Sequence, residues 1–248
     1  MDNKDFIENA REKIKKGLSV DDLIRKLLAF SDSLEKGENI VFEQLNDLYF
    51  LYYPEAANEL AERDKFIDSL MKYCDRDNIS RKMNVRVDSM GYDMEDDDLQ
   101  LMSMSVNELG NMSSLRKLVV ERLYEIVKKE YPNLSAVLGP EITARILYLS
   151  KSSHSLVFMP SSKIQVLGAE KAMFAARKKK ATPKYGVIYN HELITDSSDK
   201  MKGKMAKILA AYASLAVKTD VLSNEDKSRE ILGKMAEDIK KARSKDGT

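Results

Sequence analysis

Residues that shape turns are scarce in this sequence. Ten glycines and five prolines occur among 248 residues, although a fold built from many strands needs frequent turns. Strand-like alternation of apolar and polar residues is also hard to find, whereas apolar residues often recur at helical spacing. With 43% hydrophobic and 33% charged residues, the chain has the composition of a globular protein that is rich in charge. The sequence therefore predicts an all-α fold.

Reactive side chains are scarce as well. Cys74 is the only cysteine, so an intramolecular disulfide is excluded and a reducing interior is favoured. His154 and His191 are the only histidines, too few for a histidine-rich metal site. No HExxH, CxxC, GxSxG or Walker pattern occurs in the sequence. We therefore expect a protein that is not an enzyme, with no catalytic residues, no metal and no cofactor.

Long apolar segments are missing too. The longest, residues 206–217, is interrupted by Lys207 and is too short to cross a bilayer. The N-terminal stretch "MDNKDFIENAREK" is charged and lacks the apolar centre of a secretory signal. The sequence thus predicts a soluble, intracellular protein.

Charge is distributed unevenly, although the net charge is only +1. Residues 1–150 contain 21 basic and 29 acidic residues, whereas residues 151–220 contain 13 basic and 5 acidic residues. Such asymmetry is expected when one segment of a chain meets a polyanion. Residues 151–220 are therefore the part of the chain best suited to bind nucleic acid.

Helical periodicity covers most of the first half of the chain. The pattern predicts one helix that starts at Ser19 and stops at Gly37, and a second that ends near Pro54. A third helix is expected to run from Pro54 to about Arg76, and a loop to follow near 77–94.

The longest periodic segment runs from Leu99 to Tyr131. Its apolar residues recur every three or four positions, as in helices that pair with a partner helix. We expect it to fold back on the preceding helical region as an antiparallel hairpin. Acidic residues at 93 and 95–98 complement the positive end of this helix, and they lack the spacing of a calcium loop.

Shorter elements are predicted in the second half. They are, in order, a helix from Pro140, a loop over 151–165, a helix over 168–179, a turn over 183–186, and helices over 200–217 and 225–242. At the start of the third of these elements, Gly168 and Ala169 offer unobstructed backbone N–H groups. A phosphate and a closely packed neighbouring backbone would both suit these small residues.

Two clusters of basic residues in this half need an explanation. Residues 177–180 are all basic, which exceeds what complementation of a helix end requires. The helix over 200–217 has an apolar face and a second face that carries lysines. Those lysines are Lys200, Lys204, Lys207 and Lys218. A helix face exposed to solvent would explain these lysines. Together with the charge asymmetry, however, the lysines favour phosphate contacts.

Three blocks in this half resemble the Nop domain family. They are "SSKIQVLGAEKAMF", "TPKYGVIYNHELI" and "KGKMAKILAAYASLAVKTD", and they occur in the order typical of that family. The stretches "YPEA", "VDSMG" and "PNLSAVLGPEITARIL" also resemble the helical region before the blocks, so the resemblance covers roughly residues 20–240. The family includes core proteins of archaeal C/D-box ribonucleoproteins and a related pre-mRNA splicing factor.

The resemblance implies a fold and a function. The fold would be all-α, with an antiparallel coiled-coil arm and a compact helical module. Family members recognise a kink-turn RNA together with a small ribosomal-protein-like protein bound to it, and their coiled coil pairs two copies. The implied domains are short N-terminal helices over 1–38, the coiled-coil arm over 39–131 with a loop near 77–94, the Nop module over 132–242 and a disordered tail over 243–248.

Carried over by position, the resemblance also implies an RNA-binding site. Residues 168–171 would face the junction between the RNA and the partner protein, with residues 163, 165 and 184 beside it. Lysines of the third block would hold phosphates. The residues of the site would be Lys163, Gln165, Gly168, Ala169, Glu170, Lys171, Arg177, Lys178, Lys184, Asn190, His191, Lys202, Lys204 and Lys207.

The chain departs from the family at its beginning. Relatives carry a separate N-terminal domain that recruits the methyltransferase fibrillarin, and few residues precede the predicted arm here. We therefore expect a short form closer in layout to the splicing factor, for which fibrillarin is a doubtful partner. The expected location is the cytoplasm of an archaeal cell, or the nucleus in a eukaryote. The alternative is a protein-only coiled-coil scaffold in which RNA binding is incidental.

Overall fold

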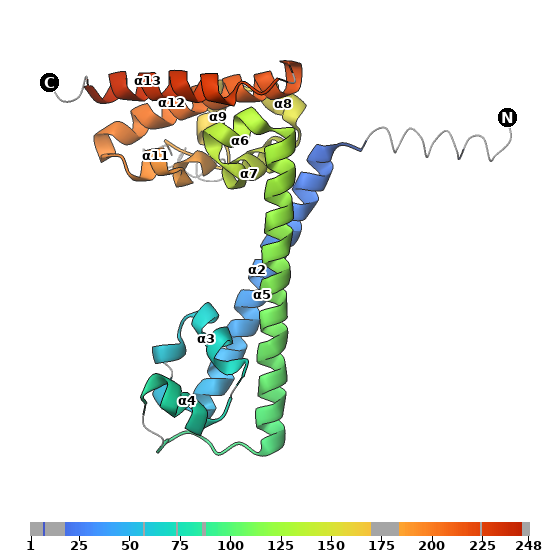
Figure 1. Cartoon of the computed structure of the whole chain (residues 1–248), viewed down its shortest axis with the longest axis vertical. Helices are drawn as coiled ribbons and strands as arrows, with labels where there is room; N and C mark the ends of the chain where they lie inside the picture. Colours follow the sequence, from blue (N-terminus) through green and yellow to red (C-terminus); the bar gives the residue numbers. More distant parts are fainter. Residues whose placement is uncertain are drawn as a thin grey trace, which may run out of the picture. The chain divides into compact units, whose positions relative to one another are not determined.

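The structure is a computed structural model that describes residues 7, 18–56, 58–72, 74–85, 88–169, 184–223 and 225–244. Within these ranges every regular element is a helix, as Figure 1 shows, which confirms the predicted all-α class. Contacts divide the chain into two compact units. Unit 1 comprises Met1–Leu28 and Glu121–Thr248, and unit 2 comprises Ala29–Val120. The predicted domain limits near 38, 131 and 242 stay predictions.

Helix α2 (Val20–Tyr52) is a single helix, and the predicted stop at Gly37 is wrong. Its start is as predicted, because Asp22 accepts hydrogen bonds from the Ser19 N–H at 3.0 Å and the Ser19 hydroxyl at 3.1 Å. A glycine inside a helix costs only about 1 kcal/mol, which packing can offset. A Cβ atom at Gly37 would come within 3.2 Å of the Met112 side chain, so the glycine allows close packing there.

Helix α5 (Asp96–Glu130) pairs with α2 in antiparallel fashion, as predicted. Along α2, Glu38 bonds to Arg116 at 2.8 Å, and further on the Leu51 carbonyl accepts from the Tyr92 N–H at 2.8 Å. Residues later in α2 thus contact residues earlier in the second half of the hairpin, which is the antiparallel arrangement. The acidic first turn of α5, residues 96–98, also lies where the sequence predicts it.

The remaining elements of unit 2 differ from the prediction. The expected helix from Pro54 to Arg76 is wrong, because short elements replace it. They are η1 (Pro54–Ala56), η2 (Asn58–Leu60), α3 (Arg63–Leu70) and α4 (Arg76–Met83). The last of these lies mostly within the predicted loop at 77–94. It starts there because the Asp75 carboxylate caps it, accepting from the Asn78 N–H at 2.9 Å.

Unit 1 is built around α12 (Asp199–Lys218), close to the predicted helix. Its buried face includes Leu209 and Ala213, which belong to one apolar core. The other elements are α6 (Pro132–Leu138), α7 (Pro140–Ser150), α8 (Ser153–Val157), α9 (Ser161–Val166), η3 (Val187–Asn190), α11 (Glu192–Thr195), η4 (Thr219–Ser223) and α13 (Ser228–Ser244). The predicted loop over 151–165 is wrong, because α8 and α9 occupy most of it. The predicted helix over 168–179 lies almost entirely outside the described residues.

A buried carboxylate fixes the end of α12 to the start of α6. Asp220 lies in the π-helical turn η4 and accepts hydrogen bonds from the backbone N–H groups of Asn133 at 3.0 Å and Leu134 at 2.8 Å. These N–H groups lack partners within their own helix. The Asn133 side chain in turn accepts from the Lys227 N–H at 2.8 Å, just before α13. One polar network therefore holds three helices of unit 1 together.

Candidate nucleic-acid interface

The first two signature blocks are joined through their backbones. The Gly186 N–H donates to the Gln165 carbonyl at 2.9 Å, and the Val187 N–H donates to the Leu167 carbonyl at 2.8 Å. The Gln165 side-chain amide adds a bond to the Lys184 carbonyl at 3.0 Å. Residues on either side of the stretch 170–183 thus lie side by side at the end of α9.

Two glycines allow this close approach. A Cβ atom at Gly186 would lie 1.9 Å from the Leu167 carbonyl oxygen, a distance that real side chains do not adopt. Gly168 has a φ of +91°, which favours glycine, and a Cβ there would lie 3.1 Å from Leu149. The described contacts of Gly168 thus match the packing interpretation of this residue, and a phosphate contact there stays a prediction.

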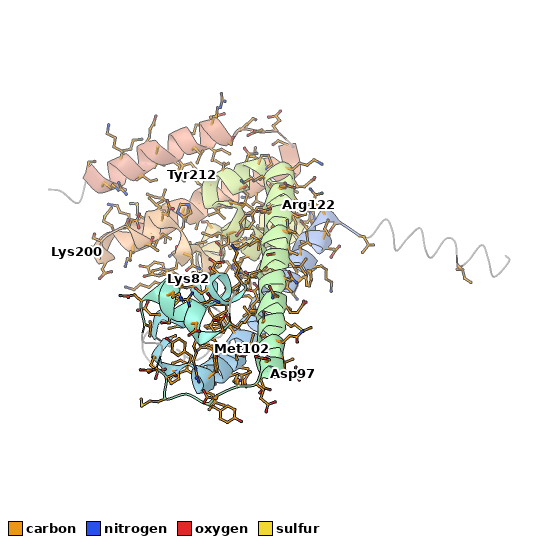
Figure 2. All side chains as sticks on the ribbon, turned by 60° about the horizontal axis from the view of Figure 1, so that its bottom comes forward. Lys82, Asp97, Met102, Arg122, Lys200 and Tyr212 are labelled. Carbon is orange, nitrogen blue, oxygen red and sulfur yellow. The ribbon has the colours of Figure 1, made fainter. Side chains whose placement is uncertain are left out.

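Exposed lysines lie on the two segments that form this junction and on α12. Lys163 on α9 and Lys184 before η3 are both exposed. Lys207 is exposed on α12, and so is Lys200, which Figure 2 labels at the start of that helix. Exposed ammonium groups on neighbouring segments can neutralise phosphates without reading sequence.

A pair of tyrosines adds an aromatic element that the sequence motifs did not reveal. The rings of Tyr185 and Tyr189 stack with centroids 5.5 Å apart and planes 29° from parallel. The Lys202 ammonium lies 5.7 Å from the Tyr189 centroid and 2.9 Å from the Asp199 carboxylate. The hydrogen bond to Asp199 raises the pKa of Lys202, so this lysine stays charged. The four-residue spacing in "YGVIY" is the signal that could have found the pair.

Lys204 is held differently from its neighbours. It is half-buried, and its ammonium donates to the Ala242 carbonyl at 2.9 Å. This carbonyl lies in the last turn of α13, where a cation complements the negative helix end. Lys204 therefore links α12 to α13, a role distinct from that of the exposed Lys207.

His191 is also engaged within the protein. Its Nδ1 accepts from the Leu193 N–H at 3.1 Å and so caps α11. Its Nε2 lies 3.1 Å from the Val137 carbonyl, which requires a proton on Nε2. Burial lowers the pKa of His191, in agreement with a neutral ring. Of the predicted pair at 190 and 191, it is Asn190 that is exposed.

Four predicted site residues lie outside the described residues. They are Glu170, Lys171, Arg177 and Lys178. Among the residues described, no group of three or more His, Cys, Asp or Glu side chains is placed to hold a metal ion. Burial raises the pKa of the Cys74 thiol, the opposite of what a reactive thiol needs. No helix in the described part of the chain has the length and apolar character to span a membrane.

The described residues define an all-α protein in which exposed lysines lie on both segments that form the junction of two signature blocks. The chain belongs to the Nop family. The model of that family, described as "snoRNA binding domain, fibrillarin", matches residues 30–245.

Relatives in archaea and in eukaryotes support this assignment. A NOP5 family protein of Methanocaldococcus jannaschii is 31% identical over 236 residues, covering 88% of this chain and 57% of that protein. Nucleolar protein 58 of Schizosaccharomyces pombe is 30% identical over 229 residues, covering 86% of this chain and 45% of that protein. The chain thus spans about half the length of these relatives.

A solved structure has a similar fold. It is the crystal structure of a fibrillarin/Nop5p complex, with a TM-score of 0.57, 23% sequence identity, and coverage of 95% of this chain and 80% of that one. At this identity the likeness shows the fold alone. The expectation that fibrillarin is a doubtful partner finds no support, because the family model and the solved complex both carry fibrillarin in their names.

Proposed function

We propose that the chain is a non-catalytic RNA-binding protein of the C/D-box ribonucleoprotein type. Its target would be a kink-turn RNA together with the ribosomal-protein-like protein bound to it. The family assignment supports RNA binding, since the family is described by its binding of small nucleolar RNA.

The observation that carries the proposal is the junction of the two signature blocks. The bonds from Gly186 and Val187 to the end of α9 bring Lys163 and Lys184 onto neighbouring segments. Such a surface suits a phosphate backbone. Each ammonium–phosphate contact releases counterions, so that affinity depends steeply on salt. Lysine contacts supply little base selection, so that specificity would come from RNA shape and from the partner protein.

Gel-shift titration of the full chain tests the proposal. Binding should be weak with naked kink-turn RNA and much tighter once the kink-turn protein is added. For Lys163→Ala or Lys184→Ala, the exposed Lys128 on α5 provides a matched control, since Lys128→Ala should leave both affinities unchanged. Equal affinity with and without the kink-turn protein would contradict recognition of a composite surface.

A protein-only scaffold is the second candidate function. Large apolar side chains are exposed along α5 of unit 2, at Leu101, Met104, Leu115 and Leu118. Recurrence at roughly helical spacing would suit self-association through the arm. Sedimentation of the RNA-free protein would then show a stable oligomer. Absence of a gel shift with any structured RNA would favour the scaffold.

The location follows from the proposed RNA partner. Eukaryotic relatives carry the name nucleolar protein 58. We infer a nuclear location if the organism is a eukaryote, and the cytoplasm if it is an archaeon.

A further inference from the structure

The loop that leads into α5 exposes two large apolar side chains. Met90 is 94% exposed and Tyr92 is 63% exposed. They lie two positions apart in unit 2, far along the sequence from the lysine-lined junction. Methionine and tyrosine are enriched at protein–protein interfaces, where each supplies much contact area.

The backbone that carries Met90 is held in place. The Glu55 carboxylate accepts from the Ser89 hydroxyl at 2.6 Å and from the Met90 N–H at 2.8 Å. The Gly91 N–H donates to the Ser89 hydroxyl oxygen at 3.0 Å. A Cβ atom at Gly91 would lie 2.1 Å from the Tyr52 carbonyl oxygen, so only glycine permits this close approach. The loop thus lies directly against the end of α2.

The backbone around Tyr92 is held equally well. Its N–H donates to the Leu51 carbonyl at 2.8 Å, and its own carbonyl accepts from Arg76 at 2.8 Å. Arg76 also bonds to the Asp93 carboxylate at 2.6 Å and lies over the Tyr52 ring, 4.4 Å from its centroid. Three consecutive N–H groups, those of residues 90–92, therefore have acceptors. A partner would meet these side chains with little loss of backbone freedom, which favours binding.

The segment that carries this apolar pair is acidic, although Arg76 pairs with one of its carboxylates, Asp93. Residues 88–98 contain six carboxylates and no lysine or arginine, and all six acidic residues are exposed. Figure 2 labels one of them, Asp97, at the first turn of α5. Phosphates and anionic membranes would be repelled here. A second copy using the same patch across a two-fold axis would also place acid against acid.

We propose that Met90 and Tyr92, with the acidic rim of residues 88–98, form a docking site for a basic protein segment. The partner would have lysines or arginines around an apolar side chain or pocket. Its charged groups would pair with the rim, and its apolar part would cover the two exposed side chains. This site shares no residue with the proposed RNA surface, and its proposal does not depend on RNA binding.

Methionine-methyl NMR of the full chain tests the proposal. The probes are a peptide of alternating lysine and leucine, a glutamate–leucine peptide of equal length, and a kink-turn RNA. The Met90 signal should shift in a saturable way with the lysine–leucine peptide alone. By fluorescence anisotropy of the labelled peptide, Met90→Ala and Tyr92→Ala should each weaken binding by about tenfold, the loss typical of interface anchors.

Ile40→Ala is the matched control, because Ile40 is 63% exposed on α2 of the same unit. It should leave affinity unchanged, and the double variant Asp96→Asn, Asp97→Asn should reduce the salt dependence of binding. The proposal is overturned by no saturable Met90 shift at millimolar peptide, by equal binding of the glutamate–leucine peptide, or by unchanged affinity of both alanine variants. A Met90 shift caused by RNA, or by concentrating the protein alone, would also overturn it.

Discussion

The Glu38 carboxylate, wholly buried, lies 2.8 Å from the Arg116 guanidinium. The pair joins α2 to α5 in unit 2, and Arg63 of α3 approaches the same carboxylate to 3.3 Å. Removing one member of such a cluster leaves an uncompensated buried charge, which is costly.

Glu38→Gln should therefore destabilise the protein strongly. Removing the negative charge leaves the partly buried Arg116 without this carboxylate and leaves Arg63 with Asn39 at 2.6 Å and Asp64 at 3.9 Å. Breaking a buried ion pair typically costs about 3–5 kcal/mol. Arg122→Ala is the control, since its pair with Glu125 is about two-thirds exposed and such pairs contribute roughly 1 kcal/mol or less. Urea denaturation followed by circular dichroism would compare the two variants. Similar losses in both would contradict a special role for the buried pair.

Gly186→Ala should disrupt the junction of the signature blocks. Its new methyl group would overlap the Leu167 carbonyl, so the segments must separate. We expect a lower melting temperature and loss of RNA binding by gel shift. Gly203→Ala on α12 is the opposite case, because a Cβ atom there meets only the Tyr185 hydroxyl at 3.8 Å. It should stabilise the helix by up to about 1 kcal/mol. Unchanged binding in Gly186→Ala would show that the junction is dispensable.

His191 should make stability depend on pH. Burial lowers its pKa below the ordinary value of 6.5, so the unfolded chain binds a proton before the folded one does. Stability should therefore be intact above pH 6.5 and fall as pH drops below it. His191→Asn keeps a capping side chain but does not titrate. Melting temperatures from pH 8 to 5 should fall less steeply in this variant, and identical slopes would exclude His191 as the cause.

Lys204→Ala and Lys207→Ala should behave differently. Loss of Lys204 removes the bond to the Ala242 carbonyl and should cost about 1 kcal/mol of stability. Loss of the exposed Lys207 should leave stability unchanged and lower the salt slope of RNA binding by roughly one unit. Thermal melts and gel shifts at several salt concentrations separate these effects. If both variants lose the same stability, the assignment of Lys204 as the structural lysine is wrong.

Long helices were predictable because periodicity accumulates over many turns. The predicted segment from Leu99 to Tyr131 begins three residues after α5 begins and ends one residue after α5 ends. The predicted helix over 200–217 differs from α12 by one residue at each end. The predicted helix end at Gly37 was wrong, because the helix-propensity cost of one glycine is small beside the packing of α2 on α5. Elements as short as α8 and α9 carry too few residues to show a period.

The candidate site was predictable only in part. Charge counts and the signature blocks selected the segments that carry the candidate site, but they could not distinguish a lysine that binds a helix end from one that faces solvent. Lys204 and Lys207 are three residues apart, and only tertiary contacts separate them. The same holds for His191, whose capping role depends on the Val137 carbonyl from a distant helix.

Unit 1 is not a continuous stretch of sequence, and this has a practical consequence for anyone who dissects the protein. A fragment that starts at Glu121 would lack Asp21, whose carboxylate bonds to the Tyr131 hydroxyl and to Ser153. It would also lack Ile24, which is fully buried in the same core. An autonomous version of unit 1 would need residues 19–28 grafted back, for example through a short linker. Shortening the hairpin is therefore a safer way to miniaturise the molecule than cutting it.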